Sequence, residues 1–152
     1  MEQELGDPRR VLSLDYAQNV RDLGGYSTAD GRTTAWGRCV RSGDMDQLSI
    51  GDRQALVAHG VDTVIDLRME KEIAAAPNRF QDSGDVHFVI HDFWGRRFDN
   101  YRSRNKGAPP EVKLADLYCE GLVQSAFVMA AIMRTVAAAD GGVAVHCRSG
   151  KD

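Results

Sequence analysis

The sequence predicts an α/β fold, in which a sheet of mostly parallel strands is flanked by helices. Three short apolar runs rich in β-branched residues, at 61–67, 85–93 and 143–147, alternate with stretches of helical pattern. Such alternation is typical of parallel strands joined by helices that cover the sheet. With 152 residues and no internal repeat, the chain has the length of one domain.

The first part of the chain predicts a tail and then extended structure. We expect residues 1–10 to form a polar, disordered tail and residues 11–152 to belong to a single domain. Residues 19–43 predict extended segments around turns, and Asp30-Gly31 is one turn signal.

The middle of the chain predicts a short helix and two strands. In "SIGDRQALVAHG", Ser49 can cap a helix together with Asp52, and Gly60 can end it. The run "VDTVIDL", between that helix and the helical stretch "EKEIAAA", is typical of a buried parallel strand, and "DVHFVIHDF" predicts a second strand.

The last third predicts a loop, a long helix and a third strand. Residues 94–113 contain Gly107 and Pro109-Pro110 and predict an irregular segment. Residues 114–139 predict one helix, which the glycine pair at 141–142 should end before the strand "VAVHC".

Composition excludes several classes of protein. The net charge of −3 and the isoelectric point near 5.8 give no field that would recruit nucleic acid. The apolar runs are too short to span a bilayer, and the N-terminus has no signal peptide. Three scattered cysteines, Cys39, Cys119 and Cys147, argue against a disulfide framework and show no zinc spacing. We therefore expect a cytoplasmic domain, although secretion without a signal peptide would also fit.

The segment "HCRSGKD" at 146–152 is the strongest chemical signal. It follows a buried strand, at the edge where an open α/β sheet holds its ligand, and backbone N–H groups in such a loop can cradle an anion. A cradle of this kind should lower the pKa of Cys147 from about 8.5. Gly150 lets the loop curl, and Lys151 adds positive charge. These features favour a nucleophilic cysteine that attacks a bound phosphate over a buried, inert one.

The chain resembles a known family at this point. "HCRSGKD" resembles the start of the cysteine-phosphatase signature HCxxGKDR. "NVRDLGGYSTADGR", "GRCVRSGDMDQLS" and "GVDTVIDLRMEKE" are similar, in the same order, to the bacterial and fungal tyrosine phosphatases that carry an NxRDLGG motif. The resemblance covers most of residues 19–152. It implies a cysteine-phosphatase-like sheet and a protein-tyrosine-phosphatase that works through a phosphocysteine, with no metal or other cofactor.

The resemblance also implies roles for individual residues. Cys147 is the expected nucleophile, and the loop residues after it are expected to bind the substrate phosphate: Arg148, Ser149, Gly150 and Lys151. Asp152 is the expected general acid, and Asp92 and Asp116 are the alternatives. The implied substrate is a phosphorylated protein, with phosphotyrosine first and phosphoserine, phosphothreonine or phosphoinositides as further substrates.

The sequence departs from the signature at its end. The signature arginine would occupy position 153, and the sequence stops at Asp152. Such an arginine would hold the phosphate and stabilise the transition state. We therefore expect the N-terminal part of a single phosphatase domain without its C-terminal helices. This part alone is expected to be inactive, or to need a separate C-terminal fragment of the same protein as a partner.

Other charged residues allow two interpretations each. A basic stretch could dock acidic phosphoproteins or inositol phosphates, or could be a solvated loop; it contains Arg96, Arg97, Arg102, Arg104 and Lys106. Asp66 could orient Lys151, or could form a structural ion pair with Arg68.

Two other functions compete with a phosphatase. A rhodanese-type sulfurtransferase also places a loop cysteine after a strand, and "CRSG" near "VIDLR" would fit it. A non-catalytic phosphate-binding module is the second alternative. The order of the N-terminal motifs, and the HC…GKD context, favour the phosphatase.

Overall fold

A five-stranded sheet carries the site in this computed structural model, which describes residues 6–95 and 110–151, with side chains from residue 115 in the second range. The strand order is β1-β2-β5-β3-β4, and only the β1–β2 pair is antiparallel. The strands are β1 (Arg21–Asp22), β2 (Cys39–Ser42), β3 (Val61–Asp66), β4 (His87–Ile90) and β5 (Gly142–His146). The predicted α/β fold with mostly parallel strands is confirmed.

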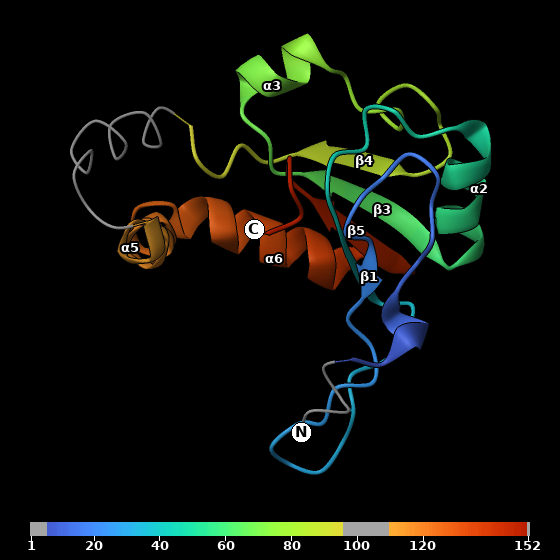
Figure 1. Cartoon of the computed structure of the whole chain (residues 1–152), viewed down its shortest axis with the longest axis horizontal. Coiled ribbons are helices and arrows are strands. Elements are labelled where there is room, and N and C mark those ends of the chain that lie inside the picture. Colours follow the sequence, from blue (N-terminus) through green and yellow to red (C-terminus); the bar gives the residue numbers. More distant parts are fainter. Residues whose placement is uncertain (1–5, 96–109, 152) are drawn as a thin grey trace.

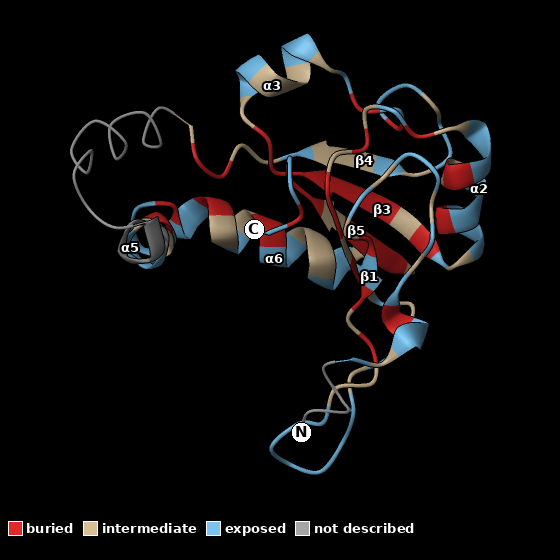
Figure 2. Ribbon diagram, in the orientation of Figure 1, coloured by how far each residue is buried: buried red, intermediate tan, exposed pale blue. Residues whose placement is uncertain are grey.

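Helices cover both faces of the sheet (Figure 1). Alternate side chains of a strand point to opposite faces, so Val64 and Ala144 pack in one core with Leu56 of α2. Ile65 and Val143 pack in the other core, against α6. Figure 2 shows how fully β3 and β5 are buried between these layers. The helices are the 3-10 helix η1 (Pro8–Arg10), α2 (Ile50–Ala58), α3 (Glu70–Ala75), α5 (Pro110–Gln124) and α6 (Ala126–Ala138).

The start of α2 has the predicted cap. The Ser49 side chain accepts a hydrogen bond from Asp52 N at 3.0 Å, and the Asp52 side chain accepts one from Ser49 N at 3.0 Å. Gly60, with φ of 105°, follows the last turn as expected. Burial alone would raise the pKa of Asp52, but hydrogen bonds from Ser49 and Asp15 hold it below its usual value.

The prediction of one helix over 114–139 is wrong. Two helices, α5 and α6, meet at Ser125 with an 81° bend, and α5 already begins at Pro110. Ser125 is buried, and its hydroxyl donates to the carbonyl oxygen of Phe93 at 2.9 Å. This bond ties the break to the segment after β4, so tertiary contact overrides the continuous helical pattern.

The structure also orders part of the stretch predicted to be a tail. Residues 8–10 form η1, and Arg10 is buried. Its Nε donates to Gly24 O at 2.8 Å and its Nη2 to Gly25 O at 2.9 Å, while the guanidinium lies 3.6 Å from the centre of the Tyr26 ring. The hydrogen bonds and the ring contact hold this part of the N-terminus in place.

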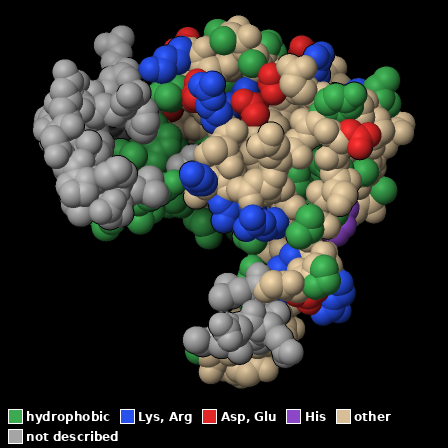
Figure 3. All heavy atoms as spheres, in the orientation of Figure 1, with side chains coloured by type: hydrophobic (Ala, Val, Ile, Leu, Met, Phe, Trp, Pro, Cys, Tyr) green, Lys and Arg blue, Asp and Glu red, His purple; other side chains and the backbone are tan. Residues whose placement is uncertain are grey.

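The outer side of α5 and α6 exposes apolar side chains (Figure 3), among them Leu122, Val123, Phe127 and Met133. Within the described ranges, neither helix alone is long and apolar enough to cross a membrane. Residues 115–124 and 126–138 reach that length and composition only when taken together, across the 81° bend.

Candidate functional site

The sheet brings three strand ends together at one edge. In the register of the parallel strands, His146 of β5 pairs with Ser42 of β2 on one side and with Asp66 of β3 on the other. The carboxyl ends of parallel strands are where open α/β sheets place their ligands. Cys147 follows His146 directly, so it lies at this edge, between the segments that leave β2 and β3.

The loop after β5 curls around the cysteine sulfur. Cys147 is 4% exposed, and the backbone N–H of Gly150 donates to its Sγ at 3.1 Å. Gly150 has φ of 70°, a conformation that glycine adopts without strain. Arg148, Ser149 and Lys151 are exposed. The predicted acid, Asp152, lies outside the described residues.

Residues distant in sequence donate hydrogen bonds to the backbone of this loop. Asn19 Nδ2 donates to the carbonyl oxygens of Ser149 at 3.2 Å and of Gly150 at 2.9 Å. Arg41 Nη2 also donates to the Gly150 carbonyl oxygen. The backbone N–H of Asp44 donates to Arg148 O at 3.2 Å. Sequence reasoning missed all three residues, because the contacts depend on the register of β2 against β5.

A buried ion pair lies beside the loop. Arg68 binds Asp66 through both carboxylate oxygens, with Nη2 donating to Oδ2 at 2.7 Å and Nε to Oδ1 at 3.0 Å. Both side chains are fully buried. Burial alone would raise the pKa of Asp66, but hydrogen bonds from His146 and Arg68 hold it well below its usual range. Of the two interpretations of Asp66, the geometry supports the structural ion pair.

The same cluster extends to Asp44 and His146. Arg68 Nη1 donates to Asp44 Oδ1 at 2.8 Å. Burial raises the pKa of Asp44, although the Arg68 charge opposes that rise. The His146 Nε2 lies 2.7 Å from Asn78 Nδ2 and 3.3 Å from Asp66 Oδ2, and its Nδ1 lies 3.3 Å from Cys147 O. His146 thus contacts the loop backbone at Cys147.

A hollow of about 330 Å³ opens over the cysteine. Trp94, Leu117 and Tyr118 supply an apolar wall, and the Trp94 and Tyr118 rings lie 5.7 Å apart. At the rim, the Arg148 guanidinium lies 3.7 Å from the Glu72 carboxylate. The hollow can therefore accept a flat apolar group beside a charged one. The sequence did not predict that Trp94, Leu117 or Tyr118 would line the site. The helix that carries Leu117 and Tyr118 was expected to run straight from residue 114 to residue 139.

The alternative acids and the other cysteines lie elsewhere. Asp92 Oδ1 accepts a hydrogen bond from Gly95 N at 2.7 Å, so it caps a turn. Asp116 is exposed on α5, as expected of a solvated helix face. Cys39 pairs with Val143, four residues before the nucleophile, which places it on the order of 13 Å away along the strand. Cys119 is exposed on α5.

The motif "RDLGG" is built into the opposite end of the sheet. The buried Asp22 carboxylate accepts hydrogen bonds from Gly24 N at 2.7 Å and Gly37 N at 2.8 Å, and lies 2.6 Å from His59 Nε2. Together with burial, this carboxylate raises the pKa of the neighbouring Cys39. These contacts indicate that the motif has an architectural role.

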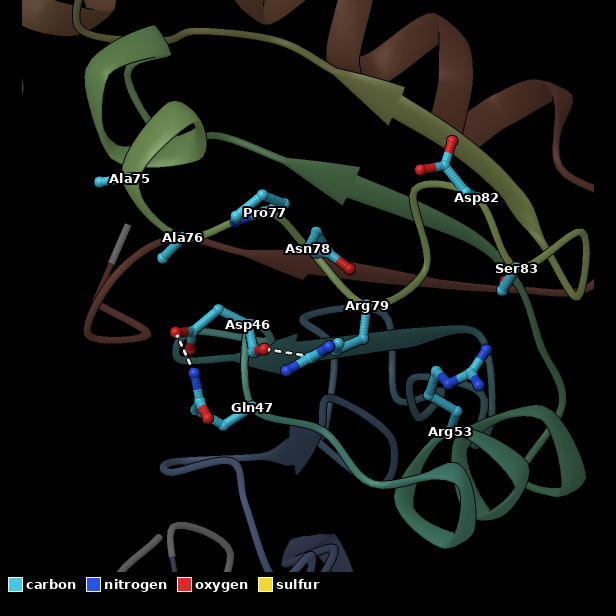
Figure 4. Close-up of a pocket in the computed structure, with 10 residues that line it drawn as sticks. All are labelled: Asp46, Gln47, Arg53, Ala75, Ala76, Pro77, Asn78, Arg79, Asp82 and Ser83. Atoms are coloured by element: carbon cyan, nitrogen blue, oxygen red, sulfur yellow. Dashed lines mark hydrogen bonds between the residues drawn. The ribbon is translucent and has the colours of Figure 1, made fainter.

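A second and larger hollow, of about 570 Å³, lies between α2 and the segment after α3 (Figure 4). Its two cations are already engaged: Arg53 pairs with Asp85 at 2.8 Å, and Arg79 Nε donates to Asp46 O at 2.7 Å. No cysteine is among the described residues that line it, so the smaller hollow over Cys147 is the candidate active site. Within the part of the chain that the structure describes, no three His, Cys, Asp or Glu side chains are grouped so that they could hold a metal ion. The basic stretch over 96–106 lies outside the described residues.

Comparison with known proteins gives a family match and one curated relative. The model of the tyrosine phosphatase family matches residues 12–152. A protein of Cupriavidus necator, named as a candidate tyrosine-protein phosphatase, is 30% identical over 151 residues, which cover 95% of this chain and 54% of that relative. The chain thus spans about half the length of the curated relative that it matches.

Proposed function

The chain belongs to the tyrosine phosphatase family, and from this premise we propose that the protein hydrolyses phosphate monoesters through a phosphocysteine formed on Cys147. The observation that carries the proposal is the place of this cysteine, at the floor of a hollow with the Gly150 N–H directed at its sulfur. A hydrogen bond from an N–H group favours the charged thiolate, which is the nucleophilic form.

The reaction we propose has two displacements. In the first, the Cys147 thiolate attacks phosphorus, so that an S–P bond forms while the bond from phosphorus to the ester oxygen breaks. In the second, water attacks the phosphocysteine, inorganic phosphate leaves and the thiolate returns. Arg148, Lys151 and the loop N–H groups would hold the phosphate oxygens in both steps.

The proposed general acid is Asp152. Its carboxyl group would give a proton to the leaving ester oxygen in the first step, and its carboxylate would take a proton from the attacking water in the second. The resemblance to the HCxxGKDR signature supports this assignment. The turn-capping role of Asp92 and the exposed position of Asp116 make those two residues weaker candidates.

The substrate we propose is a phosphotyrosine protein. The Trp94 and Tyr118 rings border the hollow and could pack against a phenyl ring. Phosphoserine, phosphothreonine and phosphoinositides are the further substrates to compare, because their phosphate groups would meet the same loop.

The test is hydrolysis of p-nitrophenyl phosphate by the full-length protein in EDTA. We expect turnover without added metal, loss of turnover in Cys147→Ser, and retained phosphate binding in that variant. Cys119→Ser, on the exposed side of α5, is the control and should keep full turnover. Asp152→Asn should slow phosphotyrosine more than p-nitrophenyl phosphate, because p-nitrophenolate leaves without needing a proton.

Four results would contradict the proposal. Two concern the mechanism: full turnover by Cys147→Ser, and a strict requirement for metal. Transfer of sulfur from thiosulfate to cyanide with no phosphate release would support a rhodanese-type sulfurtransferase instead. Phosphate binding with no turnover of any ester would support a binding module.

A further inference from the structure

Asn19 has an unusual backbone conformation in the segment before β1. Its φ is 60°, and within residues 6–95 and 110–151 it is the only residue other than glycine with a positive φ. Asparagine tolerates this left-handed region better than most residues, but the conformation still has a cost. A cost of this kind persists only when the surrounding contacts compensate for it.

The contacts that compensate are those with the loop after β5. The Asn19 Nδ2 reaches the carbonyl oxygens of Ser149 and Gly150, 130 and 131 residues away in sequence. The fit is close, because a Cβ atom added at Gly150 would lie 2.9 Å from Asn19 Nδ2 and 2.8 Å from Gly43 N. The left-handed backbone of Asn19 thus directs its amide onto the carbonyl oxygens of Ser149 and Gly150.

Gly150, which accepts one of these hydrogen bonds, also donates a hydrogen bond to the proposed nucleophile, Cys147. The carbonyl group of Gly150 accepts hydrogen bonds from Asn19 and Arg41, while the N–H group of the same residue donates to Cys147 Sγ at 3.1 Å. Glycine changes its φ and ψ at little cost. The Gly150 N–H shares its peptide plane with the Ser149 carbonyl, which also accepts from Asn19 at 3.2 Å. Without the Asn19 amide this peptide could rotate, and the N–H group could turn away from the sulfur.

We propose that Asn19 is a positioning residue for the reaction: by holding the carbonyl oxygens of Ser149 and Gly150, its amide keeps the Gly150 N–H on the sulfur of Cys147. This inference rests on the proposed function, in which Cys147 is the nucleophile. Asn19 acts through Gly150 and does not touch the substrate. It also gives the first residue of the "NVRDLGG" motif a role at the site, although the rest of that motif is architectural.

The test compares two glycine substitutions in the full-length protein. Asn19→Gly keeps the left-handed backbone without strain and removes the amide. Gln18→Gly adds the same flexibility one residue earlier, at an exposed side chain, and keeps the backbone carbonyl that accepts from Gly43 N; it is the matched control. Asn19→Asp keeps the shape but places an acceptor against two carbonyl oxygens.

The main measurement is the rate of Cys147 alkylation by iodoacetamide as a function of pH, mapped by peptide mass spectrometry. In Asn19→Gly we expect the midpoint of this curve of alkylation rate against pH to move upward by about one pH unit, since a hydrogen bond to the thiolate is lost. We expect kcat/KM for p-nitrophenyl phosphate to fall by about tenfold to a hundredfold. Asn19→Asp should be affected at least as much, and Gln18→Gly should match the unmodified protein.

Two outcomes would overturn the inference. An unchanged alkylation profile in Asn19→Gly, even with a lower melting temperature, would mean that the amide serves folding alone. An equal shift in Gln18→Gly would mean that flexibility of the segment, and not the amide, moves the sulfur. Because alkylation needs no turnover, these outcomes are separate from failure of the proposed function, which Cys147→Ser reports.

Discussion

The substitution Arg68→Met tests the buried ion pair that lies beside the Cys147 loop. The guanidinium group binds both oxygens of Asp66 at 2.7–3.1 Å, and it also reaches Asp44 Oδ1 and Ala76 O at 2.8 Å each. Methionine fills similar space but offers no donor. The substitution would leave the Asp66 carboxylate fully buried without its cation.

The expected magnitude follows from that burial. Removing one partner of a buried pair typically costs about 3–5 kcal/mol, because the remaining charge is uncompensated. Arg32→Met is the matched control: Arg32 also pairs with the aspartate two residues before it, Asp30, at 2.7 Å, but the two side chains are 83% and 53% exposed. An exposed pair of this kind contributes about 0–1 kcal/mol. Urea unfolding of the full-length protein at pH 7 would compare the two losses.

The loss of stability in Arg68→Met should depend on pH, in a direction set by the pKa of Asp66. The folded-state pKa of Asp66 is lowered, so its contribution to stability is present above its unfolded pKa of about 3.9 and is lost as the pH falls through the folded value. In Arg68→Met, burial without the cation should instead raise the folded-state pKa, and protonation would then relieve the penalty. The difference in unfolding free energy between the two proteins should therefore shrink as the pH falls from 7 toward 4.

Two results would refute this reasoning. The first is a loss for Arg68→Met no larger than that for Arg32→Met. The second concerns the double variant Asp66→Asn with Arg68→Met, which removes both charges and should recover part of the stability. If the double variant were less stable than Arg68→Met, the uncompensated carboxylate would not be the cause of the loss.

The other predictions concern the scaffold. Ser49→Ala removes the acceptor for Asp52 N and should lower the unfolding free energy by about 1 kcal/mol in urea unfolding; an unchanged midpoint would mean that the cap contributes nothing. In Gly142→Ala, the new Cβ would overlap the Gly37 carbonyl oxygen, so the central strand must shift, at about 1–3 kcal/mol. Thermal unfolding should show this loss and none for Gly6→Ala, where nothing lies within 4 Å; equal melting temperatures would contradict it.

The elements that sequence predicted well are those governed by local pattern. The β-branched run of β3 and the cap of α2 by Ser49 are both set by neighbours in sequence, and both lie where expected. The bend at Ser125 was not predictable, because "SAFVMAAIM" continues the helical pattern. Its cause is the bond from Ser125 to Phe93 O, 32 residues earlier. Arg10 was misjudged for the same reason, since its partners are backbone oxygens 14 and 15 residues later.

The residues of the site also fall into two groups: those that local sequence predicts and those that depend on distant contacts. The place of Cys147, at the end of a buried central strand, could be predicted from the strand that precedes it, and Gly150 from the loop's need to curl. The residues that hold the loop could not be predicted. Asn19 and Arg41 reach Gly150 across 131 and 109 residues, and Asn78 reaches His146 across 68. Contacts of this kind depend on strand order and register, which a single sequence does not specify.

Three of the four stretches that carry the family resemblance form one structural unit. Gly43 N donates to Gln18 O at 2.9 Å, and Asp44 N donates to Arg148 O at 3.2 Å. Asn19 Nδ2 donates to Gly150 O at 2.9 Å. Three segments, from the "NVRDLGG" motif, from the turn after β2 and from the loop after β5, therefore support one another. The loop contains a left-handed glycine and no regular structure of its own, so its sequence alone does not fix its shape. The other two segments therefore support the geometry around Cys147, which explains why a motif near residue 19 and the cysteine at residue 147 lie in the same structural unit.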